Sequence, residues 1–189
     1  MTEEPARGVT IREAYSGYTP PISARSMVER LIGGLPEKYV AGLHSIVLTN
    51  ASGLNRKGRK GRTLSRKRKV AIVKSRGLYH PRWQGEPAWI EIYVDNALAR
   101  WPTWLLWIPL LRDIPLAQVL FHELGHHIHK TRAPEHRERE DAADQWHDRL
   151  ARVYFKRRYW FLLPAVWVLA PFARRLERWL TRRSTRAAK

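Results

Sequence analysis

Apolar and polar residues recur along the chain with two different periods, which separate helical from extended segments. Apolar residues at helical spacing predict a first helix that begins behind Ser23 or Ser26 as its cap and ends near residue 34. Two runs rich in β-branched residues, at 44–50 and 70–79, predict strands after this helix.

The segment AWIEIYVDN, residues 88–96, alternates strictly between two faces. One face carries Ile90, Ile92 and Val94, and the other carries Trp89, Glu91, Tyr93 and Asp95. A period of two is typical of a strand that is buried on one side only. We therefore expect a half-buried antiparallel strand here, at a sheet edge.

Two long segments in the second half of the chain have the period of a helix. The first, LAQVLFHELGHHIHK at 116–130, places apolar residues three and four apart, and the second, at 134–158, opens with Pro134 as its first helical residue. Strands that precede a pair of helices predict an α+β fold, with a small antiparallel or mixed sheet packed on these two helices.

The length of 189 residues favours one domain with appendages. We expect a flexible lead over 1–22, where little is apolar, and a domain over 23–158 that includes a basic loop at 55–69. Residues 159–189 form an apolar, Arg-flanked C-terminal segment that we expect to be helical. No internal repeat is visible.

The chain carries 35 Lys and Arg against 17 Asp and Glu, a formal charge of +18. In the run 56–69, nine of fourteen residues are basic and none is acidic, which predicts a solvated loop or a hairpin tip. Such a surface attracts polyanions, so nucleic acid and an anionic membrane are both candidate partners, through this run and the Arg-rich C-terminus.

The absence of cysteine excludes disulfides and thiolate zinc sites, so a metal would have to be bound by His and carboxylate groups. The amino terminus lacks the basic and then apolar pattern of a secretory signal, from which we expect a cytoplasmic protein. The stretches 101–111 and 159–172 are rich in Trp, broken by Pro and flanked by Arg. They either pack on the core or lie in a membrane interface, which would make the protein peripheral to the membrane.

His122, Glu123 and His126 form the pattern H-E-x-x-H within the predicted helix at 116–130. Residues four apart lie one turn apart on one face, so two imidazoles can bind one metal ion while Glu123 reaches a water molecule on it. Gly125 lies between the two histidines, where a helix would favour Ala. A solvated, His-rich helix is the alternative interpretation.

A catalytic zinc ion usually has three protein ligands, so a third is needed. His129 lies about 10 Å along the helix axis from His122, at about 1.5 Å per residue, and cannot bind the same ion. The following helix offers seven candidates: Glu135, His136, Glu138, Glu140, Asp141, Asp144 and His147. We expect Glu140, because in EDAAD it precedes a small Ala and an Asp144 that can accept the second ring N–H of a ligand histidine.

HELGHHIH followed by EDAAD resembles the gluzincins, the glutamate-ligand zincin metallopeptidases, in particular the ImmA/IrrE-like and M48-like groups. The resemblance covers residues 88–155, although the interval between His126 and Glu140 is shorter than is usual in these groups. It implies a minimal zincin core in which His122, His126 and Glu140 bind one Zn²⁺ per chain. Glu123 would then be the general base and Asp144 would support a ligand.

The resemblance implies hydrolysis of a protein or peptide substrate, which in zincins commonly lies along an edge strand; residues 88–95 would serve by analogy. The sequence leaves four candidates for the group that stabilises the transition state: His129, His136, His147 and Tyr154. The alternative function is a basic protein that binds nucleic acid or an anionic membrane and has a structural or vestigial metal site.

Overall fold

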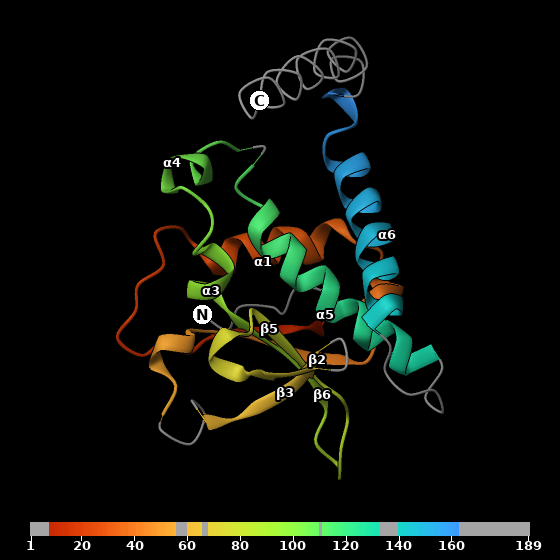
Figure 1. The fold of residues 1–189 in the computed structure, drawn as a ribbon. Helices are drawn as coiled ribbons and strands as arrows, with labels where there is room; N and C mark the ends of the chain where they lie inside the picture. The colour runs from red at the N-terminus through yellow and green to blue at the C-terminus, as the bar shows by residue number, and fades with distance from the viewer. Residues whose placement is uncertain (1–7, 56–59, 66–67, 110, 133–139, 163–189) are drawn as a thin grey trace, which may run out of the picture. The chain divides into compact units, whose positions relative to one another are not determined.

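The structure is a computed structural model that describes residues 8–55, 60–65, 68–109, 111–132 and 140–162. The chain divides into two units, Met1–Tyr154 and Phe155–Lys189. The first unit has an α+β fold: a four-stranded mixed sheet, a two-stranded hairpin and the helices that pack on the sheet (Figure 1). The predicted fold class is therefore confirmed.

The strands of the larger sheet are β1 (Thr10–Glu13), β2 (Leu43–Thr49), β5 (Gly77–His80) and β6 (Ala88–Tyr93), in the order β1-β2-β6-β5. Strand β2 is parallel to both β1 and β6, whereas β5 is antiparallel to β6 and forms an edge. The predicted strand exists as β6, which ends at Tyr93 because Val94 begins α3. It is antiparallel to β5, as expected, but β2 pairs with its other side, so the expected position at a sheet edge is wrong. Alternation reports burial of one face, and it is the same for a parallel strand inside a sheet.

Strand β1 lies within the segment for which the sequence predicted a flexible lead, so that prediction is wrong for Thr10–Glu13. The strand contributes little apolar surface, with only Ile11 buried among its four residues. Backbone pairing holds it instead: it runs parallel to β2, and Ala14 N donates to Leu48 O at 2.8 Å just beyond the strand.

The five helices with assigned bounds are α1 (Ala24–Gly34), α3 (Val94–Leu98), α4 (Thr103–Leu106), α5 (Ile114–Arg132) and α6 (Glu140–Arg158). Short 3-10 turns occur at Glu37–Tyr39, Ala51–Gly53, Ile72–Lys74 and Trp160–Leu162. Ser23 caps α1 by accepting a hydrogen bond from Ser26 N, one of the two caps that the sequence offered.

Helices α1 and α5 lie on one face of the sheet and contact each other (Figure 1). The sheet meets them with rows of apolar residues that are paired across the strands. Ile46 of β2 lies opposite Ile90 of β6, Leu48 lies opposite Ile92, and all four side chains are fully buried. This core holds α5, the helix that carries the H-E-x-x-H pattern, against β5 and β6.

A buried polar cluster connects α1 with the start of α5 and with α6. Asp113, which is 1% exposed, receives hydrogen bonds from Arg30 at 2.8 Å and from the Tyr154 hydroxyl at 2.9 Å. The Tyr154 ring lies against Gly34, where an added Cβ would be 2.6 Å from the ring. Glycine at this position of α1 therefore makes room for the ring.

The basic run overlaps the antiparallel hairpin of β3 (Arg62–Ser65) and β4 (Arg68–Ala71), so the expected loop at 55–69 is in part a hairpin. Residues 56–59 and 66–67 of the run lie outside the described residues. In the second unit the structure describes residues 155–162, which include the end of α6 and the turn Trp160–Leu162, and the predicted helix beyond them lies outside. Among the described helices, none combines the length and the hydropathy that crossing a bilayer requires.

Candidate metal centre

His122 and His126 project from one face of α5, as their spacing predicts. Their rings lie edge to face, with centroids 4.9 Å apart and planes at 88°. Leu116, Leu120 and Leu124 of the same helix are fully buried. Because this apolar side of α5 faces the core, the side that carries the two histidines keeps partial access to solvent.

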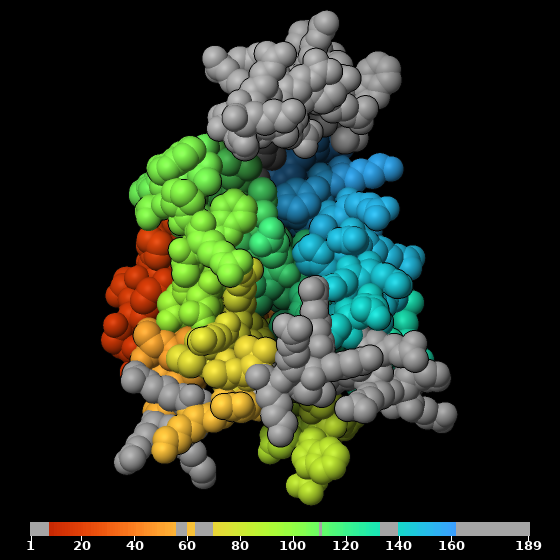
Figure 2. All heavy atoms as spheres, in the orientation of Figure 1, coloured from red at the N-terminus to blue at the C-terminus, as the bar shows by residue number. Residues whose placement is uncertain are grey.

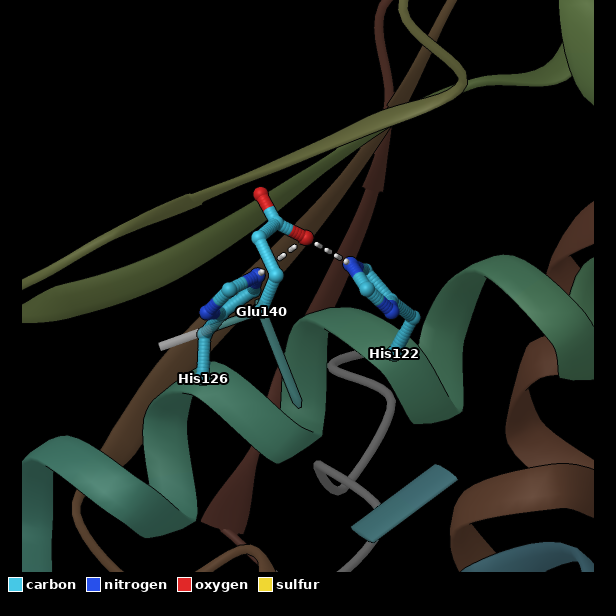
Figure 3. Close-up of side chains that lie close together, drawn as sticks. All are labelled: His122, His126 and Glu140. Carbon is cyan, nitrogen blue, oxygen red and sulfur yellow. Dashed lines mark ion pairs between the residues drawn. The ribbon is translucent and has the colours of Figure 1, made fainter. Parts of the chain in front are cut away.

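Glu140, the first residue of α6, faces both histidines (Figure 3). Its Oε2 atom lies 3.3 Å from His122 Nε2 and 3.9 Å from His126 Nε2. One potential ligand atom from each of the three residues lies within 4.8 Å of the other two. A tetrahedral zinc ion about 2.1 Å from each ligand needs ligand atoms about 3.4 Å apart, so this donor set fits zinc after small side-chain movements.

Asp144 lies one turn after Glu140, on the other side of the His122 ring. Its Oδ1 atom is 3.1 Å from His122 Nδ1. A carboxylate in this position accepts a hydrogen bond from the ring N–H at Nδ1. The proton then stays on Nδ1, and the lone pair of Nε2 is directed toward Glu140 and His126. The role predicted for Asp144 therefore agrees with its position.

Burial changes the protonation of His126. It lowers the pKa of His126 to about 4, with a smaller contribution in the same direction from the neighbouring His122, against the opposing effect of Glu140 and Asp144. His126 is consequently neutral at pH 7, which is the form that binds a metal ion.

Glu123, one residue after His122 and three before His126, is only 7% exposed. It points toward the edge strand β5, where a Cβ added to Gly77 would be 2.9 Å from Glu123 Oε1 and 2.7 Å from Val119 Cγ1. The missing side chain of Gly77 therefore makes room for the Glu123 carboxylate. Glu123 is not among the three clustered residues.

Two small residues allow α6 to approach α5 closely at this site. A Cβ added to Gly125 would lie 2.6 Å from the carbonyl oxygen of Ala143 and 2.8 Å from its Cα. Ala143 lies between Glu140 and Asp144, so the contact with Gly125 sets the distance of both carboxylates from the histidines. This explains the glycine in the middle of an otherwise good helix.

His127 links α5 to the edge strand β5 and is not part of the cluster of His122, His126 and Glu140. Its Nε2 atom lies 2.9 Å from Ala41 O, which can only accept, so Nε2 carries the proton and Nδ1 accepts from the Tyr79 hydroxyl at 3.3 Å. Burial lowers the pKa of His127 and keeps it neutral, although the bond to Ala41 acts in the opposite direction. Tyr79 and Gly77 both belong to β5.

Sequence reasoning missed Gly77, Tyr79 and His127, because their roles depend on β5 lying beside α5, and no local spacing signals that arrangement. Three other candidates from the sequence lie outside the described residues: Glu135, His136 and Glu138. Tyr154 is buried and donates to Asp113, so it serves the core rather than a transition state. His129 and His147 do not join the cluster.

Comparison of the chain with protein-family models, with curated proteins and with solved structures gives no match.

Proposed function

We propose that the protein is a zinc-dependent metallopeptidase in which His122, His126 and Glu140 bind one zinc ion per chain. The observation that supports this most strongly is the convergence of three ligand atoms from two helices within 4.8 Å of one another. The buried carboxylate of Glu123 one residue after a ligand histidine adds the group that peptide hydrolysis needs.

Zinc in such a site lowers the pKa of water toward neutrality and polarises the carbonyl group of the substrate. The residues of the chain supply the remaining steps. Glu123 accepts a proton from the attacking water and delivers it to the leaving amine. Asp144 holds the His122 ring in the tautomer and orientation that binding requires.

A peptide substrate in an extended conformation would pair with β5, and this replaces the earlier expectation that residues 88–95 bind it. Strand β5 is the edge beside α5, whereas both sides of β6 are already paired. An edge strand has backbone N–H and C=O groups available for an added strand. Gly77 of β5 lies directly against Glu123, so a peptide on this edge would be near the proposed base.

The first test is metal content, measured by elemental analysis of the purified chain after zinc is supplied. We expect about one zinc ion per chain in the wild type and a large loss in His126→Ala and in Glu140→Ala. His147→Ala and Asp141→Ala are matched controls, because both residues lie on α6 outside the cluster and should leave the zinc content unchanged. A wild-type chain without zinc would overturn the proposal.

The second test separates binding from catalysis with Glu123→Gln. Cleavage of a mixture of quenched fluorogenic peptides should fall by about 10²- to 10⁴-fold, because the variant lacks the base, while the zinc content stays at the wild-type level. A Glu123→Gln variant that cleaves these peptides at the wild-type rate would exclude Glu123 as the base. Loss of zinc in the same variant would instead place Glu123 in the metal site.

A further inference from the structure

The segment around α4 exposes large apolar side chains. Trp104 is 65% exposed, Trp107 is 74% exposed and Ile108 is 37% exposed, whereas Leu106 between them is 2% exposed. The side chain of Leu106 therefore packs into the protein, whereas the side chains of Trp104 and Trp107 point outward. We call residues 100–109 the α4 segment (Figure 1). Its light-green side chains lie at the surface in the space-filling view (Figure 2).

Exposure of this kind is unusual for a surface that faces only water. Scattered single apolar residues are common, but adjacent exposed Trp and Ile residues within one short segment indicate an interaction site. The sequence left open whether the stretch at 101–111 packs on the core. Within its described part, the structure buries Leu106 and leaves the indole rings of Trp104 and Trp107 outside.

The charges around these side chains favour an anionic partner. No Asp or Glu occurs between Asp95 and Asp113, while Arg100 and Arg112 flank the aromatic residues in a chain of net charge +18. Arg100 is exposed. Trp is the residue that most favours the interface between lipid headgroups and acyl chains, and Arg beside it attracts anionic headgroups.

We propose that the α4 segment docks in the interface of an anionic phospholipid bilayer, with Trp104, Trp107 and Ile108 inserted among the headgroups. The second unit carries a similar feature, because Trp160 is 67% exposed and Phe161 is 57% exposed in a region flanked by Arg.

A third exposed aromatic residue provides a matched control. Trp83 is 69% exposed in the turn between β5 and β6. Strand β6 runs from this turn toward α3 and the α4 segment, so Trp83 and α4 lie at opposite ends of β6 (Figure 1). Docking through the α4 segment therefore leaves Trp83 in water.

The experiment is co-sedimentation of the full chain with vesicles of equal parts phosphatidylglycerol and phosphatidylcholine. We expect the wild type and Trp83→Ala to bind these vesicles alike, and neither to bind vesicles of pure phosphatidylcholine. The double variant Trp104→Ala/Trp107→Ala should lose about tenfold or more of the partition coefficient, because two interfacial anchors are removed.

The absence of cysteine makes a site-specific second measurement possible. Thr103→Cys and Glu86→Cys each introduce one thiol, on the α4 segment and in the Trp83 turn respectively, and both positions are exposed. An environment-sensitive dye at residue 103 should shift its emission to the blue when anionic vesicles are added, and the same dye at residue 86 should not.

Undiminished vesicle binding by the double variant, with no emission shift at residue 103, would overturn the proposal. Binding that disappears only when residues 159–189 are deleted would also overturn it, because the second unit alone would then bind lipid. Self-association in the absence of lipid that Trp104→Ala/Trp107→Ala abolishes would assign the patch to a second copy of the chain. The zinc content of the double variant should equal that of the wild type, so this proposal and the proposed function are tested separately.

Discussion

Replacement of Gly125 by Ala tests whether the close approach of α5 and α6 forms the proposed zinc site. The added methyl would lie 2.6 Å from Ala143 O and 2.8 Å from Ala143 Cα, where ordinary contacts begin at 3.4 Å. The obstacle is backbone, which cannot rotate away, so α6 must retreat by about 0.8 Å, the difference between 3.4 Å and 2.6 Å. The helix that carries Glu140 and Asp144 moves with it.

The effects on stability and on binding can be separated by size. Alanine favours a helix interior over glycine by about 1 kcal/mol, and overpacking costs about 1–3 kcal/mol, so the free energy of unfolding should fall by about 0–2 kcal/mol. Zinc–ligand distances keep within about 0.2 Å of their usual values, so side chains must make up for any shift of the backbone that carries them. A shift several times larger should therefore lower zinc affinity by about tenfold or more.

Zinc affinity can be measured by competition with a chromophoric chelator, and stability by urea denaturation of the apo protein. Gly33→Ala is the matched control, because Gly33 lies in α1 and an added Cβ there meets nothing within 4 Å. The control should bind zinc as the wild type does and be up to about 1 kcal/mol more stable. If Gly125→Ala binds zinc with wild-type affinity and gains the same stability as Gly33→Ala, the reasoning about the helix contact is refuted.

Three further substitutions test other contacts. Asp144→Asn should lower zinc affinity by about 10- to 100-fold in the chelator assay, because it weakens the support of His122; an unchanged affinity would contradict this. Tyr154→Phe removes a donor from the buried carboxylate of Asp113 and should reduce the free energy of unfolding by about 1–3 kcal/mol, with zinc content unchanged. At Asp95, burial raises the pKa, but hydrogen bonds from backbone N–H groups outweigh it and hold the pKa below the usual 3.8. In urea titrations the wild type should therefore have a higher free energy of unfolding than Asp95→Asn above about pH 4, and this difference should disappear on acidification. A difference that does not depend on pH would contradict the lowered pKa of Asp95.

The cluster of His122, His126 and Glu140 was predictable because its determinants are local in the sequence. His122 and His126 share a helix face through their spacing alone, and Glu140 lies only 14 positions after His126 on the next helix. Gly125 and Ala143 are small residues in the two patterns, and the structure joins them in the contact that brings the helices together.

The strand order and the exposed tryptophans were not predictable in this way. Alternation in residues 88–95 identified the buried face of β6, but the direction and position of a strand depend on partners that are distant in sequence. The run around Trp104 is apolar whether it lies inside or outside, so its sequence could not decide between core and surface. Strand β1 has a single buried residue, which is too weak a signal to separate it from a loop.

Strand β1 also determines how far the amino terminus can be shortened. It covers the outer side of β2, which has β6 on its other side. A chain that began after Glu13 would leave the backbone groups of β2 unpaired over four residues, along a strand whose Ile46 and Leu48 belong to the core. Exposed edges of this kind pair with one another between molecules, so such a truncation should promote aggregation, in addition to removing the buried side chains of Val9 and Ile11.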